Sequence, residues 1–141
     1  MKRNAELMHI LLVEDSVADV EMTLEALADA KVANDVTVVR DGASAIALLL
    51  DATQPKPDLV ILDLNLPRMS GHEVLSRMRN DDRLRRIPVA VLTTSSAESD
   101  VAKTYDLGAN CFLTKPVDID QFVHVVQSID DFWLGLVRLP S

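Results

Sequence analysis

The chain has 141 residues, of which 48% are hydrophobic and 26% are charged. This length fits one domain with a full hydrophobic core, and this composition argues against intrinsic disorder. The net charge of −8 argues against a nucleic-acid partner, which would need a basic surface. No stretch approaches the roughly 18 consecutive apolar residues of a membrane-spanning helix. The first apolar run is not followed by a cleavage pattern, so we expect a cytoplasmic protein without a membrane partner.

Five short apolar runs of strand length alternate with segments of helical character. The first run ends at Glu14-Asp15, and the third delivers Asp63 to its carboxyl end. Runs that are apolar on both faces are typical of parallel sheets covered by helices. The predicted strands cover residues 8–13, 36–39, 59–62, 89–92 and 111–113.

The intervening segments carry apolar residues at helical spacing and begin or end at residues that favour helix termini. Ser16 is the predicted N-cap of the first helix, and Gly108 the glycine that follows the fourth. Their inward faces are Val20, Leu24 and Leu27 in the first helix, Val74, Leu75 and Met78 in the third, and Phe122, Val125 or Val126, and Ile129 in the last. The later four helices are predicted at 43–50, about 70–78, about 97–107 and from about 118 onward.

This alternation predicts an α/β fold with a doubly wound parallel sheet and helices on both faces. Five-stranded sheets of this kind most often have the flavodoxin-like order 2-1-3-4-5, with a switch point between strands 1 and 3. We expect a single domain over residues 1–141, with a core at about 8–130 and an apolar tail at 131–141.

Candidate site residues follow four of the five predicted strands. Glu14 and Asp15 follow the first and Asp63 the third, and these strands are neighbours about 4.8 Å apart in the expected order. Three converging carboxylates repel one another unless a cation lies among them, and hard oxygen ligands favour Mg²⁺. The alternatives are a solvated acidic rim without an ion, or an Asp63 that only caps its turn.

Thr93 follows the fourth predicted strand and Lys115 the fifth. A hydroxyl and an ammonium facing a metal-bound carboxylate are suitable donors for phosphoryl oxygens. Asp63 is then a candidate nucleophile that forms an acyl phosphate. Taken singly, Thr93 could cap the next helix and Lys115 could be a surface residue.

Four segments of the chain form one pattern: Ile10-Leu11-Leu12-Val13-Glu14-Asp15, Asp58 to Pro67, Val91-Leu92-Thr93 and Phe112-Leu113-Thr114-Lys115-Pro116. Together they resemble the receiver domain of two-component response regulators, over nearly the whole chain. The resemblance implies that Asp63 accepts a phosphoryl group from a phosphohistidine of a partner histidine kinase. It implies Mg²⁺ held by Asp15, Asp63 and the backbone carbonyl of Asn65, with Glu14 assisting through water. Thr93 and Lys115 would bind phosphoryl oxygens.

The same resemblance implies a switch and a fixed peptide bond. Thr93 would move toward the phosphoryl group, and Phe112 would turn inward and alter the face formed by the fourth helix, fifth strand and fifth helix. The alternative for Phe112 is plain core packing. The Lys115-Pro116 bond would be cis.

The end of the chain, from Phe132 to Ser141, is unusually apolar. An exposed patch of this kind often marks an interface, so we expect a homodimer through the last helix and this tail; the alternative is that the tail covers the chain's own core. We expect a stand-alone receiver that controls an unidentified downstream protein. A weaker resemblance to single-domain regulators of phytochrome-type sensor kinases suggests such a kinase as partner.

Two other functions use related folds. A phosphatase of the haloacid-dehalogenase class also has an aspartate nucleophile and Mg²⁺, but needs a second Asp where this chain has Asn65. A flavin- or nucleotide-binding module would have a glycine-rich loop where this chain has Glu14-Asp15-Ser16. We therefore expect a signalling protein that phosphorylates and dephosphorylates only itself, and no turnover enzyme.

Overall fold

The computed structural model describes residues 7–29, 34–93, 108–109, 111–115, 120 and 124. Five parallel strands form one sheet of order β2-β1-β3-β4-β5, which confirms the predicted topology. The strands are β1 (Met8–Val13), β2 (Asn34–Val39), β3 (Leu59–Asp63), β4 (Val89–Thr93) and β5 (Cys111–Thr114). β2 begins two residues earlier than predicted because Asn34 and Asp35 pair with Met8 and His9.

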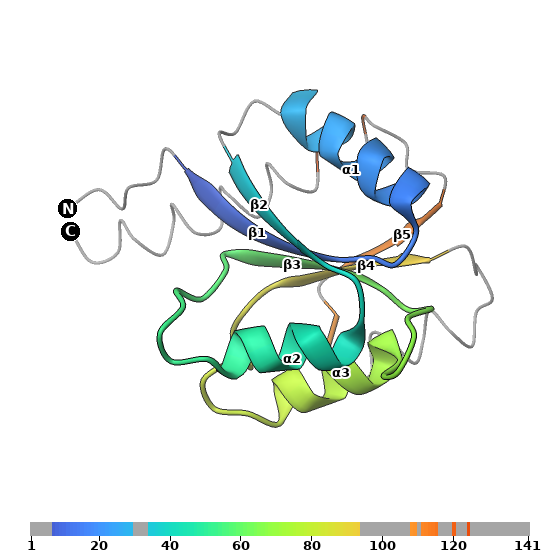
Figure 1. Ribbon diagram of the computed structural model, residues 1–141. Helices are drawn as coiled ribbons and strands as arrows, with labels where there is room; N and C mark the ends of the chain where they lie inside the picture. The colour runs from blue at the N-terminus through green and yellow to red at the C-terminus, as the bar shows by residue number, and fades with distance from the viewer. Residues whose placement is uncertain are drawn as a thin grey trace.

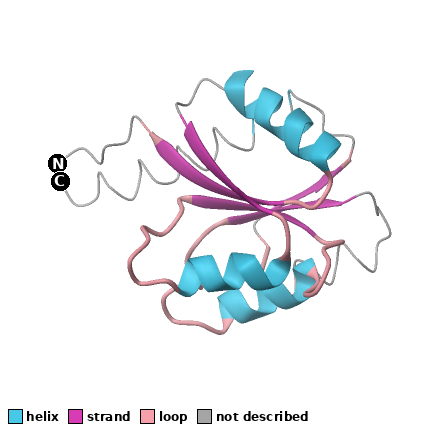
Figure 2. Ribbon diagram, in the orientation of Figure 1, coloured by secondary structure: helices cyan, strands magenta, loops and turns pink. Residues whose placement is uncertain are grey.

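Three described helices cover the two faces of the sheet: α1 (Val17–Asp29), α2 (Gly42–Leu50) and α3 (Gly71–Arg79). α1 lies on one face, and α2 and α3 lie side by side on the other (Figures 1 and 2). The predicted helices at 97–107 and from 118 onward fall outside the described residues, except for Asp120 and His124. Gly108 has a φ of 97°, the left-handed conformation expected of a glycine after a helix.

Alternate residues of the inner strands point to opposite faces and build two hydrophobic clusters. One packs under α2 and α3 and includes Val60, Leu62 and Val91; the other packs under α1 and includes Ile61, Ala90 and Leu92. The predicted inner face of α3 is confirmed, since Val74, Leu75 and Met78 are fully buried. Both faces of β3 are therefore buried from solvent, and the end of this strand is a rigid support for a functional side chain.

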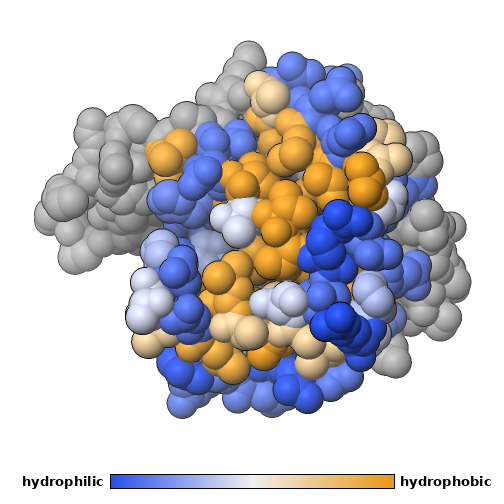
Figure 3. Space-filling view, in the orientation of Figure 1, coloured by the Kyte–Doolittle hydropathy of each residue, from blue (hydrophilic) through white to orange (hydrophobic). Residues whose placement is uncertain are grey.

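The predicted inner face of α1 is partly wrong. Leu24 is 37% exposed, whereas the buried residues are Thr23, Ala26 and Leu27. The buried face of α1 is therefore formed by the small Thr23 and Ala26 together with Leu27, and Leu24 lies outside it. Figure 3 shows hydrophobic side chains gathered across the middle of the face that lies over the edge strand β2.

Asp41 caps the N-terminus of α2, as its position before Gly42 requires. Its Oδ1 accepts a hydrogen bond from the Ser44 backbone N–H at 2.7 Å, and this bond lowers the pKa of Asp41 below its usual value. Because the pKa of Asp41 is lowered in the folded state, the cap contributes its full stability at pH values above the ordinary pKa of Asp. This contribution is lost as the pH falls through the lowered pKa of the folded state.

We therefore predict that Asp41→Ala lowers the melting temperature at neutral pH and that the difference from wild type shrinks in acid. Asp41→Asn is the matched control, because an Asn cap does not titrate and its effect should not fade in the same way. Thermal melts at pH values from roughly 2 to 7, a range that spans the ordinary pKa of Asp, measure the effects of both substitutions. An Asp41→Ala deficit that is equally large at the acid end would contradict this account of the cap.

Candidate functional site

Asp63 is the last residue of β3, at the carboxyl edge of the sheet. Strand pairing sets it beside Leu92 of β4, and only 5% of the residue is exposed. Its Oδ1 accepts a hydrogen bond from the Asn65 backbone N–H at 3.2 Å. The carboxylate is thus fixed at the end of the central strand, where ligands of open α/β sheets bind.

The start of α3 packs directly against the backbone of Asp63. A Cβ at Gly71 would collide with the Asp63 carbonyl oxygen and the Leu64 Cα, so the close approach requires glycine. The Gly71 N–H also donates to the Leu64 carbonyl at 3.0 Å. These contacts hold the turn that carries Asn65 against the end of β3.

Glu14 brings a second buried carboxylate to the same edge. Its backbone N–H donates to the Val39 carbonyl at 3.0 Å, which continues the β1–β2 pairing one residue beyond β1. Its side chain is 1% exposed, and Oε2 accepts a hydrogen bond from the Ser16 backbone N–H at 3.1 Å. Ser16 in turn caps α1, since its Oγ accepts from the Asp19 N–H at 3.2 Å, as the sequence predicted.

Lys115 follows β5 and extends its ammonium between these acids. Nζ lies 2.6 Å from Glu14 Oε1, 2.8 Å from Asp19 Oδ2 and 3.4 Å from Asp63 Oδ2. The lysine side chain is 8% exposed. Three carboxylates and one ammonium from three separate segments therefore share one largely dry space.

Burial and charge act in opposite directions on the two innermost groups. Burial raises the pKa of Glu14 above its ordinary value, and the ammonium of Lys115 only partly offsets this. Burial alone would lower the pKa of Lys115, but the contacts with Asp19, Glu14 and Asp63 together outweigh it and raise this pKa. The lysine is thus firmly charged, and the cluster keeps an excess of negative charge that attracts cations.

The cluster differs in membership from the one expected at the strand ends. Asp15 is exposed, and the Arg40 guanidinium donates to its backbone carbonyl at 2.8 and 3.2 Å. The acid that joins Glu14 and Asp63 at Lys115 is Asp19, in the first turn of α1, which the sequence reasoning missed. Its position four residues after Asp15, in a helix that starts at the edge of the sheet, is the signal that could have found it.

The donor set fits a hard divalent cation. Glu14 Oε1 is buried and, despite its ion pair with Lys115, makes no hydrogen bond of good geometry with the described residues. Carboxylate oxygens of this kind are the ligands that Mg²⁺ and Mn²⁺ prefer. Within the described part of the chain, no three acidic, histidine or cysteine side chains already form a metal-binding group. The Lys115 ammonium instead lies among the carboxylates.

Comparison with known families identifies this arrangement. Residues 10–127 match the response regulator receiver domain. This chain belongs to that family. A receiver domain is the module of two-component systems in which signals pass by phosphorylation, and the chain is a response regulator of that kind.

Two cyanobacterial proteins and one bacteriophytochrome regulator are among the relatives. The response regulator Rcp1 of Synechocystis sp. is 43% identical to this chain, over 94% of this chain and 92% of its own length. The crystal structure of its Mn²⁺-bound form superposes with a TM-score of 0.76, over 95% of this chain and 99% of that one. The phosphorylated cyanobacterial phytochrome response regulator RcpA is 45% identical, with a TM-score of 0.76 over 95% and 99%. The bacteriophytochrome response regulator RtBRR is also 45% identical, with a TM-score of 0.78 over 87% and 78%.

These matches give no support to the phosphatase or the flavin- or nucleotide-binding alternatives. Among the helices of the described residues, none has the length and apolar character needed to cross a membrane.

The remaining predicted site residues of the receiver domain are described only in part. The backbone of Thr93 pairs with Thr114, directly before Lys115, while its side chain lies outside the described atoms. Phe112 is half-buried and packs against the cluster under α2 and α3. Pro116 and the tail at 131–141 fall outside the described residues.

Arg79, at the end of α3, ties together the segments that lead into β4 and β5. Its guanidinium donates to the backbone carbonyls of Gly108 at 2.9 Å and of Arg85 and Ile87 at 3.0 Å. Burial lowers the pKa of this arginine from its ordinary value, but it stays charged at neutral pH. This support under the chain before β5, and hence under Lys115, was not predicted from the sequence.

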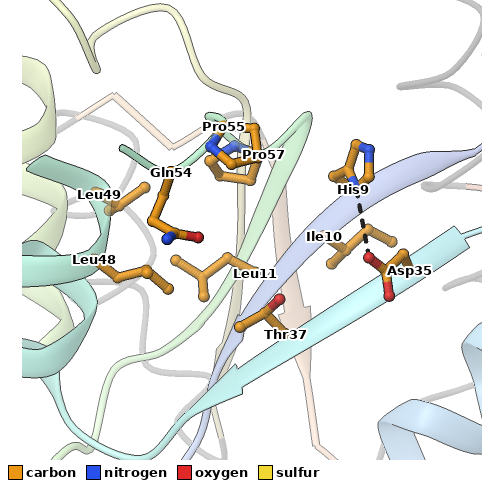
Figure 4. A pocket seen from close by; sticks show the side chains of 10 residues that line it. All are labelled: His9, Ile10, Leu11, Asp35, Thr37, Leu48, Leu49, Gln54, Pro55 and Pro57. Carbon is orange, nitrogen blue, oxygen red and sulfur yellow. Dashed lines mark ion pairs between the residues drawn. The ribbon is translucent and has the colours of Figure 1, made fainter. Parts of the chain in front are cut away.

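A cavity of about 220 Å³ lies at the other end of the strands, beside the starts of β1 and β2 (Figure 4). Its polar rim includes His9 and Asp35, whose Nδ1 and Oδ2 are 3.6 Å apart, and its floor includes Leu11 and Leu49. The four residues Glu14, Asp19, Asp63 and Lys115, called the acid–lysine cluster below, do not line it. This cavity is therefore separate from the receiver site.

Proposed function

We propose that Asp63 is the residue that accepts the phosphoryl group, from a phosphohistidine of a partner sensor kinase. The observation that carries this proposal is the convergence of Asp63, Glu14 and Lys115 from three strand ends on one buried space. A carboxylate beside a fixed ammonium is suited to phosphoryl transfer, which depends mainly on positioning and charge neutralisation.

The transfer is a displacement at phosphorus. An Asp63 carboxylate oxygen attacks the phosphorus, an O–P bond forms, and the N–P bond of the phosphohistidine breaks with its electron pair passing to the imidazole nitrogen. Later, water attacks the phosphorus, the O–P bond breaks, and the Asp63 carboxylate and inorganic phosphate are released. The protein thus returns to its starting state without acting as a turnover enzyme on other substrates.

Each neighbouring residue has a defined role in this proposal. Lys115 and the Thr93 hydroxyl bind the phosphoryl oxygens and offset their charge. Asp15, Asp63 and the Asn65 carbonyl would hold Mg²⁺, and Glu14 would assist through water. The cation, when bound, neutralises charge on the reacting phosphoryl group. The Mn²⁺-bound structure of Rcp1 and the carboxylate donor set support a divalent ion at this place.

The output of the switch involves Thr93 and Phe112. The phosphoryl group draws Thr93 toward Asp63, and Phe112 turns further into the space vacated, which reshapes the face around β5. Phe112 is half-buried against the core and so has a partly exposed position from which to move. A cis Lys115–Pro116 bond aims the lysine at the site.

We further propose a phytochrome-type histidine kinase as partner in the cytoplasm, supported by the similarity to RcpA, a phytochrome response regulator, and to RtBRR, a bacteriophytochrome response regulator. The domain spans residues 1–141 with a core at about 8–130. The last helix and the tail at 131–141 form a homodimer interface, and the regulated downstream protein binds the switched face.

The test is incubation with acetyl phosphate and Mg²⁺ followed by intact-mass measurement. Wild-type protein should gain the mass of one phosphoryl group, and Asp63→Asn should gain none. Asp82→Asn is the matched control, because the Asp82 side chain is 92% exposed and lies outside the cluster. Phosphorylation of Asp63→Asn at the wild-type rate would refute the proposed acceptor.

A further inference from the structure

The acid–lysine cluster contains one carboxylate that the proposed mechanism does not use. Asp19 Oδ2 accepts a hydrogen bond from Lys115 Nζ at 2.8 Å, although the two residues are 96 positions apart in the chain. Asp19 belongs to the first turn of α1 and is held there by the Ser16 cap. Its contact with Lys115 is thus a tertiary link between the first helix and the end of β5.

The distances show how Lys115 divides its interactions. It donates a hydrogen bond to Asp19 at 2.8 Å and forms a close ion pair with Glu14 at 2.6 Å, whereas its 3.4 Å separation from Asp63 is longer than a charge-assisted hydrogen bond. An ammonium has three N–H donors. One of them is given to Asp19, and the ion pair with Glu14 lies on the same β1–α1 segment, so the ammonium lies closer to this segment than to Asp63.

Burial determines which of the two partners can release the lysine. The Glu14 side chain is 1% exposed, so losing Lys115 would leave a buried carboxylate unpaired. The Asp19 side chain is 32% exposed, and water can replace the ammonium there. Asp19 is therefore the partner that Lys115 can exchange at low cost.

We propose that Asp19 is a positioning residue that competes with the phosphoryl group for Lys115. In the unphosphorylated protein Asp19 holds one N–H of the ammonium, and on phosphorylation that N–H passes to a phosphoryl oxygen while water solvates Asp19. This inference rests on the proposed function of Asp63 and Lys115 and adds a restraint on it. The restraint lowers the affinity of the site for a phosphoryl group.

The first test is the affinity for beryllofluoride, a stable phosphoryl mimic, measured by ¹⁹F NMR titration in the presence of Mg²⁺. Asp19→Asn and Asp19→Ala should both bind it roughly threefold to tenfold more tightly than wild type, the range that loss of one competing hydrogen bond gives. Glu21→Gln is the matched control. It removes one negative charge from an exposed position of the same helix and should leave the affinity unchanged.

The second test reads the lysine directly. The ¹⁵N resonance of the Lys115 ammonium should shift in both Asp19 variants and stay in place in Glu21→Gln.

A third test uses acetyl phosphate as the donor. The Asp63 oxygen attacks phosphorus, and acetate leaves with the electron pair of the broken O–P bond. The initial rate of this reaction should rise in the Asp19 variants by a factor similar to the gain in affinity.

The possible failures are distinguishable. If wild-type protein neither binds beryllofluoride nor gains a phosphoryl group, the proposed function fails. If wild type does both but the Asp19 variants bind no more tightly, or the control shows the same gain, the competition proposed for Asp19 is overturned. Thermal melts of both variants show whether either result comes from unfolding.

Discussion

Replacing Lys115 with methionine is expected to slow phosphorylation of the protein by acetyl phosphate about 100-fold or more, the usual effect of removing one preorganised donor from a charged transition state. The variant keeps a long apolar stem but removes the ammonium that lies within 3.4 Å of Asp63, Asp19 and Glu14. The phosphoryl oxygens then lose their cationic partner, and the carboxylates around them repel the incoming anion.

The same substitution is expected to lower the free energy of unfolding by about 3 kcal/mol in metal-free buffer, as expected when one partner of a buried ion pair is removed. Burial already raises the pKa of Glu14, and without the ammonium this carboxyl has to take up a proton or remain charged in a dry place. Urea unfolding followed by circular dichroism measures the loss, and initial rates are compared where both proteins are folded. Lys56→Met is the control, and an equal loss of rate in that variant would contradict the assigned role of Lys115.

Removal of divalent metal is expected to have an effect of similar size. Chelation with EDTA should reduce phosphorylation by acetyl phosphate about 100-fold or more, and added Mg²⁺ should restore it, because one ammonium cannot offset both the surrounding carboxylates and the incoming group. Mg²⁺ should also raise the melting temperature of wild-type protein, since a ligand of the folded state stabilises it.

The change in melting temperature separates metal binding from chemistry. It should be much smaller in Asp63→Asn, which removes a proposed ligand, and unchanged in Asp82→Asn. Full phosphorylation in EDTA, or an Mg²⁺ effect on stability that survives Asp63→Asn intact, would be incompatible with metal binding at this site.

The sheet was predictable because its strands carry strong local signals. Runs such as 59–62 and 89–92 are apolar on both faces, and the alternation with helical segments allows few topologies. The order β2-β1-β3-β4-β5 then brings the ends of β1, β3 and β5 to one edge. Glu14, Asp63 and Lys115 could be assigned to one site for this reason alone.

The side-chain directions beyond the strand ends were not predictable in the same way. β1 ends at Val13 and only the Glu14 N–H continues its pairing with β2, so strand alternation alone did not decide which of Glu14 and Asp15 faces inward. A local hydrogen bond from the Ser16 N–H holds the Glu14 carboxylate, while the Arg40 guanidinium, brought near by the tertiary fold, donates to the Asp15 carbonyl. Asp19 was missed because the candidate site residues were sought at the strand ends, whereas Asp19 lies in the first turn of α1. Leu24 was misplaced because the buried face of α1 is formed by Thr23, Ala26 and Leu27, two of which are not large apolar residues.

One backbone feature and one side-chain feature also had no clear sequence signal. Arg68 has a φ of 69°, in the left-handed region that non-glycine residues seldom adopt, within the turn that follows Asp63. Arg79 is half-buried and donates to three carbonyls of two other segments. An arginine is ordinarily expected at the surface, whereas the guanidinium of Arg79 holds the segments before β4 and β5.

Chemical mapping of the modified residue tests the acceptor most directly. Protein treated with acetyl phosphate and Mg²⁺ is reduced with borohydride, which converts an aspartyl phosphate to homoserine, and is then digested and sequenced by tandem mass spectrometry. We predict that homoserine appears at position 63 and at no other aspartate. Homoserine at Asp15 or Asp19 with Asp63 unmodified would contradict the account.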